Sequence, residues 1–134
     1  MTILHVEEKP ILTSEDVVLV RQAVRAQAVQ AGFSLVDQTK LVTAASELAR
    51  NALEHGGGGS VRLELINDGV RRAVRLTFQD NGPGIRDIQQ ALKDGFTTGG
   101  GLGLGLSGAK RLSNEFDIAS APGQGTRVTI ARWR

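Results

Sequence analysis

Apolar residues recur at helical spacing through the first half of the chain. An apolar position returns every three or four residues between Val17 and Ala28, which predicts a helix with one buried face. Thr13 opens the sequence Thr-Ser-Glu-Asp, which offers a capping hydroxyl and first-turn carboxylates, and Gly32 closes the segment. The same spacing starts again near Val36 and continues to the glycine run 56–59, which predicts a second helix.

Apolar and polar residues then alternate strictly, which is typical of strands with one buried face. The two clearest strands, 61–65 and 74–78, are separated by Asn67-Asp68-Gly69, and together they predict a β-hairpin. Three further strands are expected at 3–7, 116–120 and 126–132, the last two of which are joined by the turn 122–125.

The remaining segments are short. Residues 81–85 predict a turn, 88–93 a short helix and 104–112 a longer one. The glycine-rich segment 96–103 has no clear period, and we expect it to be a mobile loop. This order of elements predicts a single α+β domain over residues 1–134, a two-layer sandwich in which helices cover one face of a mixed, mostly antiparallel sheet.

Composition narrows the class of protein. The 134 residues include no cysteine, which excludes disulfides and thiolate metal sites and favours a reducing cytosol, so we expect a cytoplasmic protein. The first ten residues lack the pattern of a signal peptide, and no apolar segment approaches the roughly 18 residues of a membrane helix. The net charge is only +2, and the Arg and Lys residues are scattered along the sequence. The hypothesis of a nucleic-acid-binding protein is therefore supported only by the basic isoelectric point.

The sequence SELARNALEHG, residues 46–56, aligns polar groups on the second helix. Glu47 and Asn51 are four residues apart and therefore project from the same side. The amide oxygen of Asn51 is a suitable Mg²⁺ ligand, because this ion keeps most of its waters and takes few protein ligands. Glu47, one turn away, can accept the proton of an attacking hydroxyl or orient it. A solvated helix face is the alternative for this spacing taken alone.

The sequence FQDNGPGI, residues 78–85, places a carboxylate at the end of a strand. Strand parity puts Asp80 on the predicted buried face, where an unpaired carboxylate is costly and needs a donor. The exocyclic amine of an adenine is a suitable donor. Gly82 and Gly84 would let the backbone pass close to a flat ring, and Ile85 offers that ring an apolar surface. The alternative is an ordinary Asn-Gly-Pro-Gly turn.

Glycines alternate with leucines in GGGLGLGL, residues 99–106, directly before the third long helix. Such glycines expose consecutive backbone N–H groups, and a helix N-terminus adds favourable partial charge, so the segment predicts a phosphate-binding loop. It lacks the Lys-Ser/Thr that ends a P-loop, and it does not follow a first strand as a Rossmann fingerprint does. A flexible linker is the alternative, although the leucines need a surface to pack on.

Taken together and in this order, the three segments resemble the N, G1 and G2 boxes of the GHKL (Bergerat-fold) ATPases and kinases. The resemblance implies that ATP and Mg²⁺ are bound. By position, Glu47 would be the catalytic base, Asn51 the Mg²⁺ ligand and Asp80 the acceptor for the adenine amine. The other residues that the resemblance assigns to the nucleotide are Gly82, Gly84, Ile85, Thr97, Thr98, Gly101, Leu102, Gly103, Leu104, Gly105 and Thr126.

The stretches SELARN, DGFTTGGGLGLGL and GAKRLSNEF are similar to those of the RsbT-type switch kinases, relatives of the anti-sigma-factor kinases. This similarity implies an ATP-dependent serine/threonine kinase that phosphorylates STAS-domain proteins of a stressosome pathway and, once released, activates a PP2C-type phosphatase. Neither His5 nor His55 lies in a phosphoacceptor hairpin, which argues against a histidine autokinase. The alternative from another class is an anti-sigma factor of the RsbW type, which sequesters a sigma factor and phosphorylates that factor's antagonist.

Overall fold

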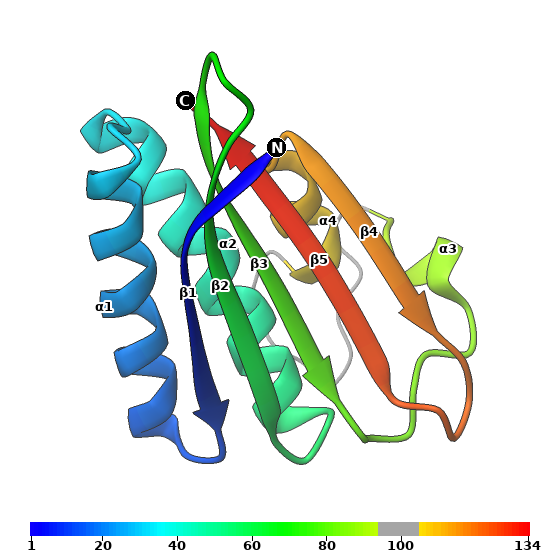
Figure 1. Ribbon diagram of the computed structural model, residues 1–134. Coiled ribbons are helices and arrows are strands. Elements are labelled where there is room, and N and C mark those ends of the chain that lie inside the picture. Colours follow the sequence, from blue (N-terminus) through cyan, green and yellow to red (C-terminus); the bar gives the residue numbers. More distant parts are fainter. Residues whose placement is uncertain (94–104) are drawn as a thin grey trace.

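The computed structural model describes residues 1–93 and 105–134. A five-stranded sheet forms one layer and the helices pack on one of its faces (Figure 1). The strands are β1 (Thr2–Ile11), β2 (Gly59–Asn67), β3 (Arg72–Asp80), β4 (Glu115–Ser120) and β5 (Thr126–Trp133). The helices are α1 (Ser14–Gln30), α2 (Leu35–Glu54), α3 (Ile88–Ala91) and α4 (Gly105–Arg111).

The strand order is β1-β2-β3-β5-β4, and each of these four pairings is antiparallel. The α+β class and the two-layer arrangement predicted from the sequence are confirmed. The described strands form a fully antiparallel sheet rather than a mixed one. Because β3 pairs with β5, the hairpin β2–β3 and the hairpin β4–β5 join along their inner strands, which places the ends of both hairpins side by side.

The first strand is longer than the sequence pattern suggested. It runs to Ile11 and pairs with β2 along its length, with a register irregularity between Ile3 and His5. The segment 8–11 is not recognised from the pattern because it begins with two charged residues and contains Pro10. A proline is tolerated here because β1 lies at the edge of the sheet, where one side of the strand has no ladder to donate to.

Local sequence signals fix the ends of the two long helices. The Thr13 hydroxyl accepts a hydrogen bond from the Asp16 backbone N–H at 3.2 Å, and the Asp16 carboxylate accepts one from the Thr13 N–H at 3.1 Å, so a capping box starts α1. Gly32 follows the C-cap with φ of +83°, a conformation in which residues with a side chain are strained. The Ser34 hydroxyl then caps α2 through the Asp37 N–H.

The core lies between the helices and the inner face of the sheet. Its side chains come from the apolar faces of α1 and α2 and from alternate positions of the central strands. Arg132 of β5 adds a polar tie at the edge of this core. Its guanidinium donates to the Asp37 carboxylate at 2.8 Å and to the Leu112 carbonyl at 2.8 Å, which holds the start of α2 and the end of α4 against the sheet. The pKa of Asp37 is lowered chiefly by the hydrogen bond from Arg132.

None of the helices in the described ranges is both long and apolar enough to cross a bilayer.

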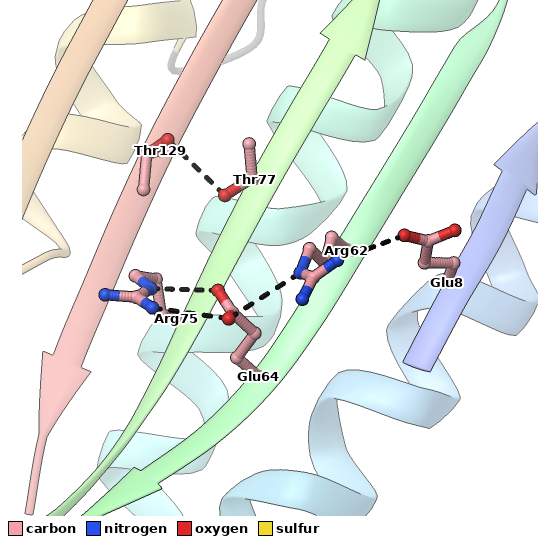
Figure 2. A network of polar contacts seen from close by, with 6 residues as sticks. All are labelled: Glu8, Arg62, Glu64, Arg75, Thr77 and Thr129. Carbon is pink, nitrogen blue, oxygen red and sulfur yellow. Dashed lines mark hydrogen bonds and ion pairs between the residues drawn. The ribbon is translucent and has the colours of Figure 1, made fainter. Parts of the chain in front are cut away.

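The outer face of the sheet, opposite the helices, carries a polar network (Figure 2). Arg75 of β3 donates two hydrogen bonds to Glu64 of β2, at 2.9 and 3.2 Å. Arg62 lies 3.6 Å from the same carboxylate and donates to the exposed Glu8 of β1 at 3.3 Å. The Glu64 side chain is only 7% exposed, and these arginines lower its pKa, with the hydrogen bond from Arg75 as the largest cause.

This network predicts a specific loss of stability in acid. The pKa of Glu64 is lower in the folded chain than in the unfolded one, so its stabilising contribution is complete above the unfolded pKa of about 4.5 and disappears as the pH falls through the folded value. Glu64→Gln should therefore cost about 1–3 kcal/mol near neutral pH, and the difference from wild type should shrink below roughly pH 4.5. Urea unfolding at several pH values measures this.

The matched control is Glu8→Gln, which changes the 70% exposed carboxylate of the same network. Its cost should stay below about 0.5 kcal/mol at every pH, since exposed ion pairs contribute little. Equal effects of the two substitutions would show that burial of Glu64 has no energetic consequence.

Candidate functional site

The candidate site begins at the end of β3, where Asp80 lies beyond a row of buried apolar side chains. Val74, Leu76 and Phe78 share its face of the sheet and are at most 2% exposed, whereas Asp80 itself is half-buried. Its Oδ1 accepts a hydrogen bond from the Gly82 N–H at 2.9 Å. The predicted orientation of Asp80 is confirmed, and the local chain supplies one donor to the carboxylate.

The loop after α2 passes directly against Asp80. A Cβ placed on Gly56 would lie 2.4 Å from the Asp80 Cγ and 2.6 Å from its Oδ2. A Cβ on Gly82 would lie 2.6 Å from the Gly56 Cα. These distances are shorter than real Cβ contacts, so only glycine fits at either position. The loop after α2 therefore packs directly against both Asp80 and the turn that follows it.

The same loop connects Asp80 to Asn51. The Gly56 N–H donates to the Asn51 carbonyl at 3.2 Å, and the His55 N–H donates to it at 2.9 Å. Asn51 is half-buried in the last turns of α2. Since Gly56 also contacts the Asp80 carboxylate, one backbone hydrogen bond and one van der Waals contact connect the backbone of Asn51 to Asp80. The structure therefore brings the first two sequence motifs together.

Glu47 links the third motif to the same helix. Its side chain is 14% exposed, and its Oε2 accepts a hydrogen bond from the Gly105 N–H, the first residue of α4, at 3.4 Å. Its Oε1 accepts one from Arg50 at 3.1 Å. The carboxylate is thus fixed by two donors that lie on different elements, while Arg50 keeps nearly half of its surface exposed.

A hydroxyl network forms the wall of the site on β4 and β5. The Ser120 Oγ accepts from the Ile85 N–H at 2.8 Å and donates to the Gly125 carbonyl at 2.8 Å. Ser120 and Thr126 hydroxyl oxygens are 2.9 Å apart. Because a serine hydroxyl has a single proton, Thr126 is the donor in this pair, and lone pairs of Thr126 stay available to accept. Thr126 also lies directly opposite Asp80 in the register of β3 and β5.

Close backbone contacts explain why positions 84 and 125 are occupied by glycine. A Cβ on Gly84 would lie 2.0 Å from the Ala121 carbonyl oxygen, and one on Gly125 would lie 2.3 Å from the Asp80 carbonyl oxygen. Gly82 and Gly84 were expected to admit a flat ring. In the structure, the close packing of one backbone segment against another already requires glycine at both positions, so a bound ring is not needed to explain these glycines.

The remaining predicted positions divide into two groups. Ile85 is half-buried beside the core and Gly105 begins α4, so both belong to the assembled site. The other candidate residues lie outside the described residues: Thr97, Thr98, Gly101, Leu102, Gly103 and Leu104. The expected mobile loop at 96–103 falls in the same range.

Three residues of the site were missed by the sequence reasoning. Gly56 was treated only as a helix stop, although its contact with Asp80 depends on a long-range approach that no local pattern encodes. Arg50 follows Glu47 by three residues, a spacing that brings side chains together on a helix, and this signal was present. Ser120 was also detectable, because the turn 122–125 pairs it with Thr126 across the hairpin.

The arrangement combines groups suited to a nucleotide and its phosphates. A half-buried carboxylate at a strand end offers a hydrogen-bond acceptor, and Thr126 offers another beside it. Asn51 and Glu47 are one turn apart on α2, and the Glu47 carboxylate accepts a hydrogen bond from the first backbone N–H of α4. Among the described residues no three His, Cys, Asp or Glu side chains gather around one point, so a metal held by protein groups alone is not indicated there.

Comparison with known proteins agrees with this arrangement. Residues 36–134 match the family described as histidine kinase-, DNA gyrase B- and HSP90-like ATPases. The serine/threonine-protein kinase RsbT of Bacillus subtilis is 43% identical over 123 residues, with 92% of each chain covered. An anti-sigma F factor of Anoxybacillus flavithermus is 31% identical over 119 residues, which cover 84% of this chain and 80% of the relative.

Solved structures share the fold. A Mycobacterium tuberculosis structure of RsbU and RsbW domains superposes with a TM-score of 0.66 at 24% identity, covering 97% of this chain and 33% of the other. The mycobacterial sensor histidine kinase MprB superposes with a TM-score of 0.56 at 20% identity, covering 95% and 96%. With the family model matching 99 of the 134 residues (36–134), this chain belongs to the histidine kinase-, DNA gyrase B- and HSP90-like ATPase family, the GHKL family to which its three motifs pointed.

Proposed function

We propose that this chain is a serine/threonine protein kinase that transfers the γ-phosphate of Mg-ATP to STAS-domain regulatory proteins in a partner-switching stress response. The observation that carries the proposal is the convergence of all three motifs on α2. Gly56 at its end contacts Asp80, and Glu47 in its middle accepts a hydrogen bond from Gly105. The relative named as a serine/threonine kinase, similar over 92% of both chains, supports the same activity.

Adenine recognition is assigned to Asp80 and its neighbours at the end of β3. Asp80 Oδ1 is already engaged by the Gly82 N–H, so the second carboxylate oxygen is the natural acceptor for the exocyclic amine. Thr126, opposite Asp80, is suited to accept a further hydrogen bond, directly or through water. Ile85, fixed by Ser120, supplies an apolar surface for the ring. The residues present therefore fit a purine with an amino group.

Mg²⁺ is assigned to Asn51. This ion is held in most kinases and ATPases by one or two protein oxygens together with phosphate oxygens and water. A single amide oxygen beside the nucleotide meets that requirement, and a cluster of acidic ligands is not needed. When bound, the ion would neutralise charge on the phosphates. Gly105 at the start of α4 is assigned to the phosphates, and residues 101–104 are predicted from the sequence alone to bind phosphate as well.

Glu47 is assigned the role of catalytic base or orienting group. In the transfer step the acceptor hydroxyl oxygen forms a bond to the γ-phosphorus, the bond to the bridging oxygen of ADP breaks, and the hydroxyl proton passes to Glu47. The Gly105 N–H and Arg50 hold the carboxylate from two sides and so restrict it to one orientation. Such restriction is valuable because phosphoryl transfer depends mainly on positioning.

The relatives, a serine/threonine kinase and anti-sigma F factors, support a partner-switching role. On the resemblance of the motifs to the switch kinases, we assign STAS-domain proteins as the phosphorylation substrates and a PP2C-type phosphatase as the enzyme that the released kinase activates. The second candidate is an anti-sigma factor of the RsbW type that also binds a sigma factor. The anti-sigma F relatives, 27–32% identical, favour it. The higher identity to RsbT, 43%, favours the switch kinase.

The catalytic assignment can be tested with two substitutions on one helix. Glu47→Gln keeps the shape of the side chain and removes its ability to take a proton, so transfer of labelled phosphate to a STAS-domain substrate should fall at least about 100-fold. ATP affinity, measured by calorimetry, should change less than about threefold. The control is Glu54→Gln, an exposed carboxylate two turns further along α2, which should alter neither quantity.

Phosphate transfer at the wild-type rate by Glu47→Gln would refute the assignment of Glu47 as the base. It would not affect the assignment of the ATP-binding residues. Strong binding of a sigma factor with no transfer to any STAS protein would instead favour the RsbW-type alternative.

The hydroxyl network predicts a second effect, on nucleotide affinity. Ser120→Ala removes the acceptor of the Ile85 N–H and the partner of Thr126, so ATP affinity should fall about 5- to 30-fold. Ser113→Ala is the control, because its hydroxyl also donates to a backbone carbonyl, that of Ala109 at 2.7 Å, but outside the site. It should leave ATP affinity unchanged. Equal losses of affinity in both variants would remove Ser120 from the site.

A further inference from the structure

Arg50 lies on α2 between the two residues of that helix that are assigned to the transfer. It follows Glu47 by three residues, a spacing that brings side chains together on a helix, and it directly precedes Asn51. Its Nη1 donates a hydrogen bond to the Glu47 Oε1 at 3.1 Å. The Glu47 side chain is 14% exposed and that of Arg50 is 46% exposed. The ion pair therefore joins a largely buried carboxylate to a cation that other molecules can reach.

Most of the Arg50 guanidinium is not engaged by the rest of the described chain. An arginine carries five N–H donors in one plane. Within residues 1–93 and 105–134, Arg50 makes no hydrogen bond besides the one to Glu47. A planar guanidinium with several donors can hold one carboxylate and still attract a second anion. The side chain thus has donors left for a phosphate group.

The proposed transfer brings two negative groups to the same side of α2. Glu47 and Asn51 are four residues apart, and at that spacing Cβ atoms on a helix are about 5–6 Å apart. A nucleotide whose phosphates bind beside Asn51 therefore adds negative charge next to the Glu47 carboxylate. Like charges so close repel, and they repel more strongly around a side chain from which most water is excluded. A cation beside the carboxylate would offset this repulsion.

We propose that Arg50 is a positioning residue for the phosphoryl transfer, which holds the Glu47 carboxylate in place and offsets its repulsion from the phosphates of ATP. This inference rests on the proposed function, because it requires ATP to bind beside Asn51 and Glu47 to take the acceptor proton. The other donor to Glu47 is the Gly105 N–H at 3.4 Å, which has no formal charge. Of these two donors, Arg50 is therefore the one that balances the carboxylate.

The alternative interpretation is an ordinary surface ion pair, which contributes little to any property of a protein. The two interpretations differ in what the effect of Arg50 depends on. A positioning residue acts through Glu47, so its removal should matter only while the carboxylate is present. Glutamine suits the substitution, because it removes the charge and is also a good helix former.

Calorimetric ATP affinities of the wild type, Arg50→Gln, Glu47→Gln and the double variant test the electrostatic part. Arg50→Gln leaves the carboxylate beside the phosphates without its cation, so the affinity should fall about 5- to 20-fold. In the Glu47→Gln background the same change should lower the affinity at most about twofold. Equal losses in the two backgrounds would overturn the proposal, because Arg50 would then act independently of Glu47.

Transfer of labelled phosphate to a STAS-domain protein at saturating ATP tests the orienting part. Arg50→Gln should lower kcat about 10- to 50-fold, since the carboxylate loses one of its two fixed contacts. Arg50→Lys keeps the charge without the planar fork, so its ATP affinity should lie within about threefold of the wild type while its kcat stays at least about fivefold lower. A merely structural role would not separate these two quantities.

Arg62→Gln is the matched control. Arg62 is 47% exposed and also pairs with a carboxylate, that of Glu8, but on the outer face of the sheet. Its replacement should change neither ATP affinity nor kcat by more than about twofold. An effect as large as that of Arg50→Gln would overturn the proposal, because loss of any exposed arginine would then suffice.

The results also separate this inference from the proposed function. Slow transfer by Glu47→Gln together with a wild-type kcat in Arg50→Gln would leave the kinase assignment in place and overturn the role of Arg50. A wild type that binds ATP and phosphorylates no STAS-domain protein would refute the proposed substrate. In that case the four ATP affinities still support or overturn the electrostatic role of Arg50.

Discussion

The close approach of the loop after α2 to the carboxylate of Asp80 is the contact on which the rest of the site depends. Gly56 lies so near that any side chain would overlap the Asp80 Cγ, and a side chain on Gly82 would overlap Gly56 in turn. This contact fixes the acidic group at the end of β3 relative to the helix that carries Glu47 and Asn51. A single hydrogen bond, from the Gly56 N–H to the Asn51 backbone carbonyl, connects this loop to α2. Separate motifs thereby become one site.

The antiparallel sheet explains why this site forms at one end of the molecule. Pairing of β3 with β5 sets Thr126 opposite Asp80, and pairing of β4 with β5 sets Ser120 opposite Thr126. Ser120 then holds the backbone of Ile85, so the wall of the site follows from strand register.

Local signals in the sequence were sufficient for most of the fold and for the members of the site that repeat a known motif. Helical spacing, the Thr13 cap and strand alternation depend on neighbours in the chain, and the structure confirms the elements that they predicted. The contacts of Gly56 and the extension of β1 through Pro10 depend on distant segments, so no local pattern revealed them. The sequence pattern suggested that Gly84 makes room for a flat ligand, although the close approach of its backbone to the Ala121 carbonyl is sufficient to require glycine there.

The central claim is that the Asp80 carboxylate accepts a hydrogen bond from the amino group of adenine. Calorimetric affinities for ATP and for inosine triphosphate, which carries a carbonyl in place of that amine, test it directly. The wild type should bind ATP at least about 10-fold more tightly, because the carbonyl would face a carboxylate. In Asp80→Asn the Gly82 N–H can still hold Oδ1, which turns the amide N–H groups toward the base and should reverse the preference. Equal affinity of the wild type for both nucleotides would contradict the account.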